Sequence, residues 1–264
     1  MTDALFHADG ARFVPDPLTR GPWSPAAMHG GPVAALLAHE AERIPAPGPM
    51  QPARLTVELL RPVPLRPLTV ETRVLRPGRK VQWVEAQLLV DDGEVARATL
   101  LRIRTEALPW PAHVAGGAVA LPIALPDTIA PVTPSWVGAE PPAYHNTATE
   151  HRIARGAWGT PGPVSDWIRL RLAVVAGAVP SPLERVAAVA DFGNGVSSAL
   201  PYAGYTFINP DLTITLHRLP AGDWVCLDAV TYPERHGIGV AESVLYDERG
   251  RLGHAAQTLL LEAR

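Results

Sequence analysis

The chain has 264 residues, of which 47% are hydrophobic and 19% are charged, so it can fold around a sizeable core as one large domain or two small ones. Its formal net charge of −3 gives no electrostatic reason to expect nucleic acid as a partner. The single cysteine, Cys226, excludes a disulfide within the chain, and neither a signal peptide nor an apolar run of the ~20 residues that a membrane span needs is evident. A cytoplasmic protein without a membrane partner is therefore expected.

A buried helix is expected after an N-terminal segment of about 25 residues. Apolar residues recur at helical spacing from Val33 onward, Pro32 suits the first turn, and Pro45 ends the helix. Gly30 and Gly31 stand at its start. They either bring helix N–H groups close to a negatively charged group, or they only let the helix pack tightly on its neighbours.

Four strands are expected between residues 53 and 104, because apolar and polar side chains alternate there. The candidate segments are LTVELL, LTVETRVLRP, VQWVEAQLLV and VARATLLRIR. A helix followed by an antiparallel meander predicts an α+β fold in which a sheet wraps around a long buried helix.

The stretch from Phe207 to Glu262 resembles the stretch from Leu55 to Ile103 when it is shifted by about 157 residues without a gap. Two β-rich segments can agree by chance. However, the turn segments DDGE and ERGR coincide under this shift and both predict hairpins, which favours a duplication. The coincident residues include Leu55 and Leu212, Thr56 and Thr213, Arg61 and Arg218, and Glu85 and Glu242.

A change in composition separates the two copies. Residues 106–141 are rich in Pro, Ala and Gly, which predicts a linker that covers apolar groups on the surface. The linker divides the chain into an N-terminal copy, residues 1–105, and a C-terminal copy, residues 142–264.

The second copy is expected to open with short strands near Thr149 and Trp167. A helix should follow Ser181, because serine suits the N-cap, Pro182 the first helical position and Glu184 the first turn. This helix occupies the place that the first helix has in the first copy.

Polar residues replace apolar ones at three positions of the second copy. A buried carboxylate must find partners or raise its pKa, and a glutamine among apolar neighbours also needs hydrogen-bond partners. Asp191 and Gln257 either meet around a water or a substrate, or they face solvent separately. Under the same shift Asp191 corresponds to Ala34, Asn209 to Pro52 and Gln257 to Leu100.

These features together resemble the double-hotdog acyl-CoA thioesterases typified by bacterial thioesterase II. The resemblance rests on HGG at the start of a buried helix, the duplication, Ala190-Asp191-Phe192 and the final strand with Gln257, and it extends from about Trp23 to Glu262. It implies a tandem hotdog, with two antiparallel sheets each wrapped around a central helix. Only the C-terminal hotdog would carry the polar site.

The resemblance also implies hydrolysis of fatty acyl-CoA to fatty acid and CoA, with no metal and no other cofactor. Asp191 matches the family's catalytic aspartate and Gln257 its glutamine. Asn209 falls where the family has Ser or Thr, and Thr213 or Thr215 could substitute if the register shifts. Asp191 would be the general base for a water that Asn209 and Gln257 position.

The acyl chain is expected to lie between the two helices, and arginines near the mouth would hold the phosphates of CoA. Backbone N–H groups at the start of the first helix would stabilise the oxyanion, while His29 fits a structural role better than that of a base. The residues expected to bind substrate are Gly30, Gly31, Val33, Leu37, Val186 and Val189.

Other chemistry finds little support in the sequence. The histidines and Cys226 lack metal-ligand spacing, and there is neither a GxSxG motif nor a nucleotide-binding loop. Two functions stay open, an acyl-CoA thioesterase and a non-catalytic acyl or acyl-CoA binding module on the same fold. Fold analogy also allows a homo-oligomer.

Overall fold

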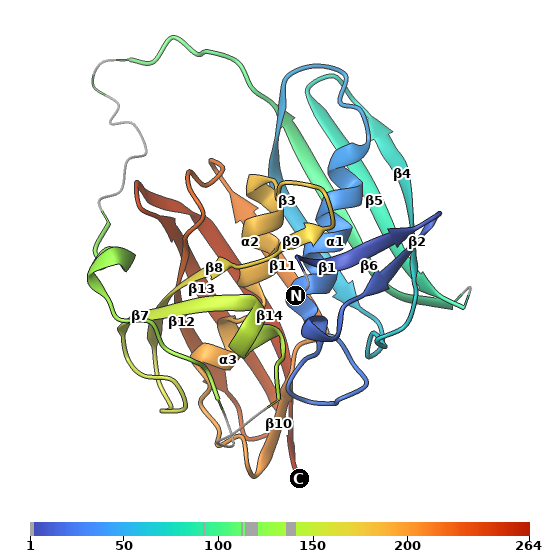
Figure 1. Cartoon of the computed structure of the whole chain (residues 1–264). Helices are drawn as coiled ribbons and strands as arrows, with labels where there is room; N and C mark the ends of the chain where they lie inside the picture. The colour runs from blue at the N-terminus through green and yellow to red at the C-terminus, as the bar shows by residue number, and fades with distance from the viewer. Residues whose placement is uncertain (1–2, 92, 112, 114–120, 136–140) are drawn as a thin grey trace.

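The computed structural model describes residues 3–91, 93–111, 113, 121–135 and 141–264 (Figure 1). One long antiparallel sheet of 11 strands dominates this part of the chain. Its strands are β3 (Met50–Leu59), β4 (Thr69–Pro77), β5 (Val81–Val90), β6 (Gly93–Arg104), β7 (Thr149–Arg155), β8 (Val164–Leu170), β10 (Tyr205–Ile208), β11 (Asp211–Leu216), β12 (Val225–Pro233), β13 (Ile238–Asp247) and β14 (Gly250–Ala263).

The spatial order of the sheet is β4-β5-β6-β3-β11-β14-β13-β12-β8-β7, and β10 pairs with the end of β14. The four strands expected between residues 53 and 104 are confirmed as β3 to β6, and those expected near Thr149 and Trp167 as β7 and β8. The fold is thus mostly sheet with few helices, in the α+β class that the sequence predicts.

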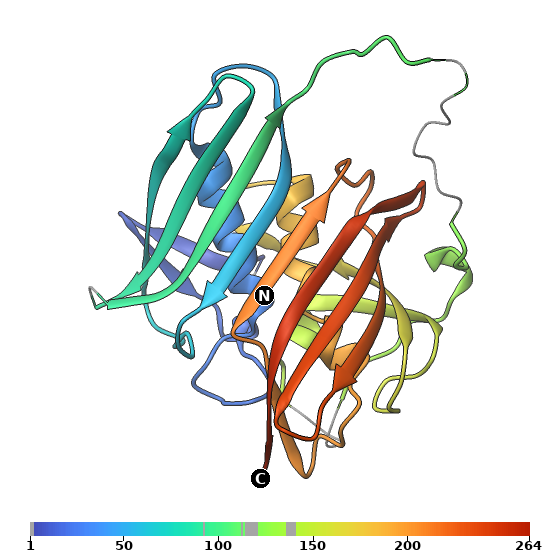
Figure 2. The same ribbon diagram turned by 180° about the vertical axis from the view of Figure 1, so that it is seen from behind.

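Two helices, α1 (Gly30–Arg43) and α2 (Pro182–Ala190), lie side by side against one face of the sheet (Figures 1 and 2). The predicted start of α2 is confirmed, because the Ser181 hydroxyl accepts the N–H of Glu184 at 3.1 Å. The helices bury their apolar side chains against each other and the sheet, and Leu37 and Val186 are fully inaccessible to solvent.

The two halves of the sheet meet at the pair β3–β11, which is visible from behind in Figure 2. Thr56 lies directly opposite Thr213 across this pair, and these are the residues that the 157-residue shift makes equivalent. A residue that pairs with its own equivalent marks the axis of a pseudo-twofold arrangement.

Irregularities in the two halves also coincide. The β5–β6 hairpin shifts register between Leu88 and Leu89, and the β13–β14 hairpin shifts between Leu245 and Tyr246. These positions are equivalent under the same shift. Since bulges are local features of a particular strand pair, the coincidence supports duplication over chance agreement.

The N-terminal segment, for which no regular structure was predicted, contains two strands. It forms a hairpin of β1 (Ala4–Asp9) and β2 (Arg12–Pro15), and β1 also pairs in parallel with β9 (Ala173–Val175), which precedes α2. The first residues of the chain therefore complete a small sheet with a strand of the second half.

The expected linker is described only in part, because residues 112, 114–120 and 136–140 lie outside the described residues. Leu121, Ile123 and Ile129 pack against a cluster that includes Trp167 and Cys226, so this part of the segment covers apolar groups as expected. None of the described helices has the length and hydrophobicity that crossing a bilayer requires.

Candidate functional site

Asp191 is the residue on which the polar side chains of the site converge. Helix α2 ends at Ala190, and Asp191 occupies its C-cap before the short helix α3 (Gly193–Val196). Only 5% of Asp191 is exposed, although it stands at a helix end. A carboxylate that is withdrawn from water to this extent requires several hydrogen-bond donors.

Two amide side chains supply donors to one oxygen of this carboxylate. Asn209 Nδ2 donates to Asp191 Oδ1 at 2.8 Å, and Gln257 Nε2 donates to the same oxygen at 3.2 Å. The structure therefore brings together Asp191, Asn209 and Gln257, the three residues that the sequence singled out. Gln257 is buried and faces inward, which excludes the alternative that its amide faces solvent.

The orientation of the Gln257 amide is fixed from both ends. Its oxygen accepts the backbone N–H of Asn194 at 3.0 Å, so its nitrogen must point to Asp191. The approach is close, since a Cβ on Gly193 would lie 2.8 Å from that oxygen. Helix α3 thus positions Gln257 through backbone atoms, and any side chain at Gly193 would disturb the contact.

His29 is a fourth member of the site, which the sequence analysis placed in a structural role. Its Nδ1 lies 2.9 Å from Asp191 Oδ2 and 3.0 Å from the N–H of Gly31. Nδ1 carries either a lone pair or a proton, so it can satisfy only one of these neighbours at a time. With a proton it donates to Asp191, and without one it accepts from Gly31 and caps helix α1.

The glycines at the start of α1 are required by close packing. A Cβ on Gly30 would lie 2.6 Å from Asp191 Oδ2, and a Cβ on Gly31 would lie 2.4 Å from the carbonyl oxygen of Ala188. Gly30 therefore lets the N-terminus of a 14-residue helix face the carboxylate directly, and the helix dipole stabilises negative charge there. The two glycines thus bring the helix N–H groups close to a negatively charged group and also let the helix pack tightly on its neighbours.

The aromatic rings of Tyr144 and Phe192 pack against His29 and hold it in place. The His29 ring packs against Tyr144 and Phe192, with ring centroids 5.0 and 4.7 Å apart. The Tyr144 hydroxyl donates to the carbonyl of Ala188 at 2.8 Å, which ties this layer to α2. Burial, and then the negative charge of Asp191, raise the pKa of Tyr144 well above its ordinary value, so it stays a neutral donor.

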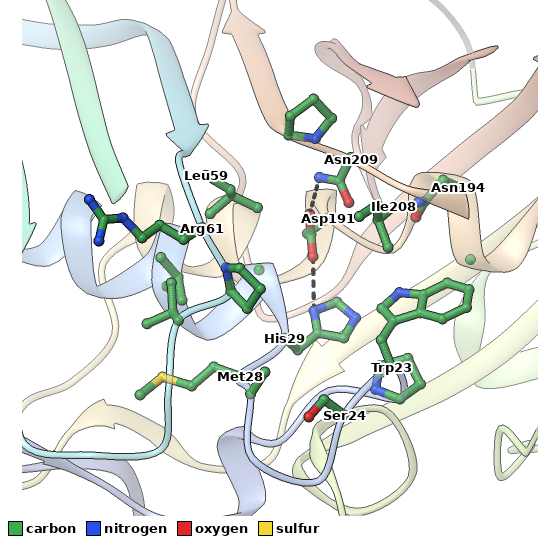
Figure 3. Close-up of a pocket in the computed structure, with 18 of the residues that line it drawn as sticks. Trp23, Ser24, Met28, His29, Leu59, Arg61, Asp191, Asn194, Ile208 and Asn209 are labelled. Atoms are coloured by element: carbon green, nitrogen blue, oxygen red, sulfur yellow. Dashed lines mark hydrogen bonds and ion pairs between the residues drawn. The ribbon is translucent and has the colours of Figure 1, made fainter. Parts of the chain in front are cut away.

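A cavity of about 440 Å³ opens beside Asp191 (Figure 3). Its volume falls within the range of small-molecule sites. The walls are mostly apolar and come from the loop before α1, the end of β3, β10 and β14, including Trp23, Met28, Leu59, Phe207, Ile208 and Leu260. The polar site thus lies at the boundary of an apolar space.

The cavity does not lie between the helices, where the acyl chain was expected. Gly30 and Val33 line it, but Gly31, Leu37, Val186 and Val189 do not. The last three side chains are buried in the apolar core to which both helices contribute. The space opens instead at the N-terminal end of α1, where the loop before this helix and the ends of strands form most of its walls.

The alternative hydroxyls can also be placed. Thr213 and Thr215 alternate along β11 with the buried residues Leu212 and Ile214, so they lie on the opposite face of the sheet from the helices. Asn209 lies in the connection between β10 and β11 and reaches Asp191 directly. The position equated with a family hydroxyl is therefore the one at the site.

The contact of His29 with Asp191 and the wall of the cavity were not predicted from the sequence. The HGG motif was a signal for His29, because histidine directly before a helix start can act as its cap. No sequence signal marks Trp23, Phe207 and Leu260 as neighbours, since they come from segments far apart in the chain. Among the described residues, no cluster of His, Cys, Asp or Glu could hold a metal ion.

Comparison with solved structures assigns the fold. A structure from Novosphingobium aromaticivorans DSM 12444 is 24% identical and covers 98% of both chains, with a TM-score of 0.74. A hot dog fold protein from Alicyclobacillus acidocaldarius is 19% identical over 99% of this chain and 97% of its own, with a TM-score of 0.75. Acyl-CoA thioesterase II TesB2 from Mycobacterium marinum is 14% identical over 90% of both chains, with a TM-score of 0.62. The chain therefore has the hotdog fold.

The sequence also matches two domain profiles, the acyl-CoA thioesterase C-terminal domain over residues 122–261 and the acyl-CoA thioesterase N-terminal domain over residues 19–103. The chain belongs to the acyl-CoA thioesterase family, as the resemblance implied. No curated protein matches the sequence.

Proposed function

We propose that this protein is a thioester hydrolase that converts fatty acyl-CoA to free fatty acid and CoA. The observation that carries the proposal is the convergence of Asn209, Gln257 and His29 on the Asp191 carboxylate beside an apolar cavity. Membership of the acyl-CoA thioesterase family supports the reaction class. The cavity supplies the apolar surroundings that an acyl chain requires.

A count of acceptor sites supports Oδ2 as the oxygen that would take the proton. Each carboxylate oxygen has two acceptor positions. Those of Asp191 Oδ1 are occupied by Asn209 and Gln257, whereas Oδ2 contacts His29 alone among the hydrogen-bonding side chains of the site. The free position on Oδ2 would therefore bind the water and act as the general base.

The reaction then follows in two steps. The water oxygen attacks the thioester carbonyl carbon while its proton passes to Asp191 Oδ2, which gives a tetrahedral intermediate. Collapse of the intermediate breaks the C–S bond, and the proton returns from Oδ2 to the departing thiolate. The carboxylate is regenerated, so no further reactant is needed.

Asn209 and Gln257 serve as positioning residues in this proposal. The amide nitrogen of Asn209 donates to Asp191 Oδ1 and to the carbonyl of Asp211, and that of Gln257 donates to Oδ1 and to the Asp191 carbonyl. Their N–H groups are thus committed to holding Asp191 and its loop. Asn209 Oδ1 is the remaining atom that could contact the water.

The oxyanion would be stabilised by the start of α1. The N–H of Gly31 is within reach of His29 and Gly31 does not line the cavity, whereas Gly30 does. The N–H of Gly30, the first residue of α1, has no acceptor within the helix. Together with the helix dipole it would bind developing negative charge without reorganisation.

The same proposal includes the architecture of a tandem hotdog. Residues 1–105 would form a catalytically degenerate copy, residues 106–141 the linker and residues 142–264 the copy with the polar site. The shared bulge positions and the seam between β3 and β11 support this division. The first copy has Pro52 and Leu100 where the second has Asn209 and Gln257, which supports its degeneracy.

The test is release of free thiol from acyl-CoAs of short to long chain, with wild type beside Asp191→Asn. This substitution keeps the shape of the side chain and removes the base, so turnover should fall by about 100-fold or more. Asp9→Asn, at an exposed position remote from the cavity, is the matched control and should retain full activity.

Absence of turnover with every chain length would contradict the proposal. Calorimetric binding of acyl-CoA without turnover would then assign the chain to the alternative class, a non-catalytic acyl-CoA binding module. Equal activity of wild type and Asp191→Asn would contradict the role of Asp191 even if hydrolysis is observed.

A further inference from the structure

Arg61 and Arg218 are equivalent residues in the two halves, and the backbone confirms the equivalence. The N–H of Leu60 donates to the carbonyl of Val95 at 3.0 Å, and the N–H of His217 donates to the carbonyl of Leu252 at 3.0 Å. Each bond anchors the residue just before the arginine at the same point of the repeat. The two arginines therefore occupy equivalent backbone positions in the two halves.

The guanidinium of Arg218 is fully engaged in an ion pair with Asp247. It donates to both oxygens of Asp247, one at 2.6 Å, and to the carbonyl of Gly250 at 2.8 Å. Asp247 is fully buried. Burial by itself acts to raise the pKa of Asp247, but hydrogen bonds from Arg218 and from the N–H groups of Ala221 and Arg249 outweigh it and hold the pKa below 3.8.

The first half retains the arginine and lacks its partner. Val90 stands at the position equivalent to Asp247, since each is the last residue of its strand and pairs with the glycine that opens the next one. Val90 is buried and has no group that could bind a guanidinium. Within the part of the chain that the structure describes, no hydrogen bond or ion pair holds the Arg61 guanidinium.

Arg61 also lies at the candidate site. It is exposed, it lines the cavity beside Asp191, and it is the only arginine or lysine among the described lining residues. Its side chain extends away from Asp191 (Figure 3). An unpaired cation thus stands at the rim of a mostly apolar cavity, on the side remote from the carboxylate.

We propose that Arg61 binds a phosphate of the thioester's carrier, the phosphorylated pantetheine arm that CoA and acyl carrier proteins share. This inference rests on the proposed function. With the thioester at Asp191 and the acyl group against the apolar walls, the remaining part of the substrate must leave through the rim. The planar guanidinium suits bidentate binding of phosphate oxygens, and loss of the intramolecular carboxylate leaves it available.

The experiment compares one acyl group on three carriers, which are CoA, 4′-phosphopantetheine and unphosphorylated pantetheine. In Arg61→Gln, kcat/KM for acyl-CoA should fall by about 10-fold or more, chiefly through KM, as expected for a lost charged hydrogen bond. The value for acyl-pantetheine should change by less than about twofold. A loss shared by acyl-phosphopantetheine supports the phosphate common to both carriers. A loss confined to acyl-CoA overturns this assignment, because it would place Arg61 on the nucleotide phosphates of CoA.

Two controls make the result specific. Arg61→Lys keeps the charge and should restore part of the loss. Arg66→Gln removes another exposed arginine nearby, one that is paired with Asp91 and does not line the cavity, and it should have no effect on any carrier. An equal loss on acyl-CoA and acyl-pantetheine, or no loss at all, overturns the role of Arg61. Failure of the wild type to hydrolyse any of the three thioesters overturns the proposed function itself.

Discussion

The two halves of the molecule use the same strand register to bury different groups. In the second half, β13 ends at Asp247 and β14 carries Gln257, and both side chains are buried with full sets of partners. The equivalent positions in the first half are Val90 and Leu100, which are buried in an apolar core. The bulge positions and the seam between β3 and β11 are shared, so at these two strand positions the difference lies in the side chains. A duplicated backbone can thus hold a polar site in one copy and ordinary packing in the other.

The largest effect should come from removing the arginine that has a partner. Arg218→Gln leaves the buried Asp247 carboxylate without its counter-ion, which should lower the free energy of unfolding by about 3 kcal/mol. Arg61→Gln, at the equivalent exposed position, should change it by less than about 0.5 kcal/mol. Urea denaturation of the two variants measures the difference directly, and equal losses would show that the arginines do not differ as described.

Giving the second half a residue of the first should remove activity. Gln257→Leu takes one donor from Asp191 Oδ1 and releases its fixed orientation, so kcat should fall by about 100-fold. Gln257→Glu tests the same position with the shape conserved and the donor lost. Thiol release from acyl-CoA measures both variants, and wild-type activity in Gln257→Leu would rule out a positioning role.

The reverse exchange should cost stability and yield no activity. Leu100→Gln puts an amide into an apolar part of the first half, where Leu55 and Val84 are its cross-strand neighbours. Without partners the amide should lower the free energy of unfolding by about 2 kcal/mol. Thermal or urea unfolding checks this. An unchanged stability would mean that a polar group in the first half forms a hydrogen bond with the new amide.

The smallest effect concerns the far end of the helix pair. There His39 Nδ1 lies 3.0 Å from Glu184 Oε1, and this hydrogen bond raises the pKa of His39 above 6.5 despite the opposing effect of burial. A raised histidine pKa stabilises the fold fully below about pH 6.5, and the contribution disappears as the pH rises through the raised value.

Stability should therefore fall by about 1 kcal/mol as the pH rises through the raised pKa of His39. Glu42 acts in the same direction, because burial raises its pKa and its ionisation becomes less favourable in the folded state. His39→Gln should flatten the pH dependence without removing the part due to Glu42. A stability of His39→Gln that falls as steeply as wild type would contradict the assignment.

Local patterns explain what the sequence could predict. The strands β3 to β6 follow from alternation, and the two helices follow from apolar spacing and from caps such as Ser181. Asp191, Asn209 and Gln257 stand out because a duplication offers an apolar counterpart for each of them. Arg218 and Arg61 were equated in the same way, but the absent partner of Arg61 became evident only when Asp247 and Val90 could be compared in three dimensions.

Non-local packing explains what the sequence could not predict. The acyl chain was expected between α1 and α2, yet Leu37, Val186 and Val189 are buried in the core and do not line the cavity. The cavity arises where loops meet strand ends, and its depth depends on backbone geometry that no residue pattern specifies. His29 reaches Asp191 only because α1 and α2 lie close enough for Gly30 to touch the carboxylate.

The pairing of β1 with β9 has a consequence for synthesis of the chain. β1 begins at residue 4, but its parallel partner ends at residue 175, so the small sheet joins segments from opposite sides of the linker. A two-stranded hairpin is marginally stable by itself in water, and contacts between distant residues form slowly. During synthesis, β1 therefore cannot complete its own sheet until the chain has been extended through Val175, well over a hundred residues later.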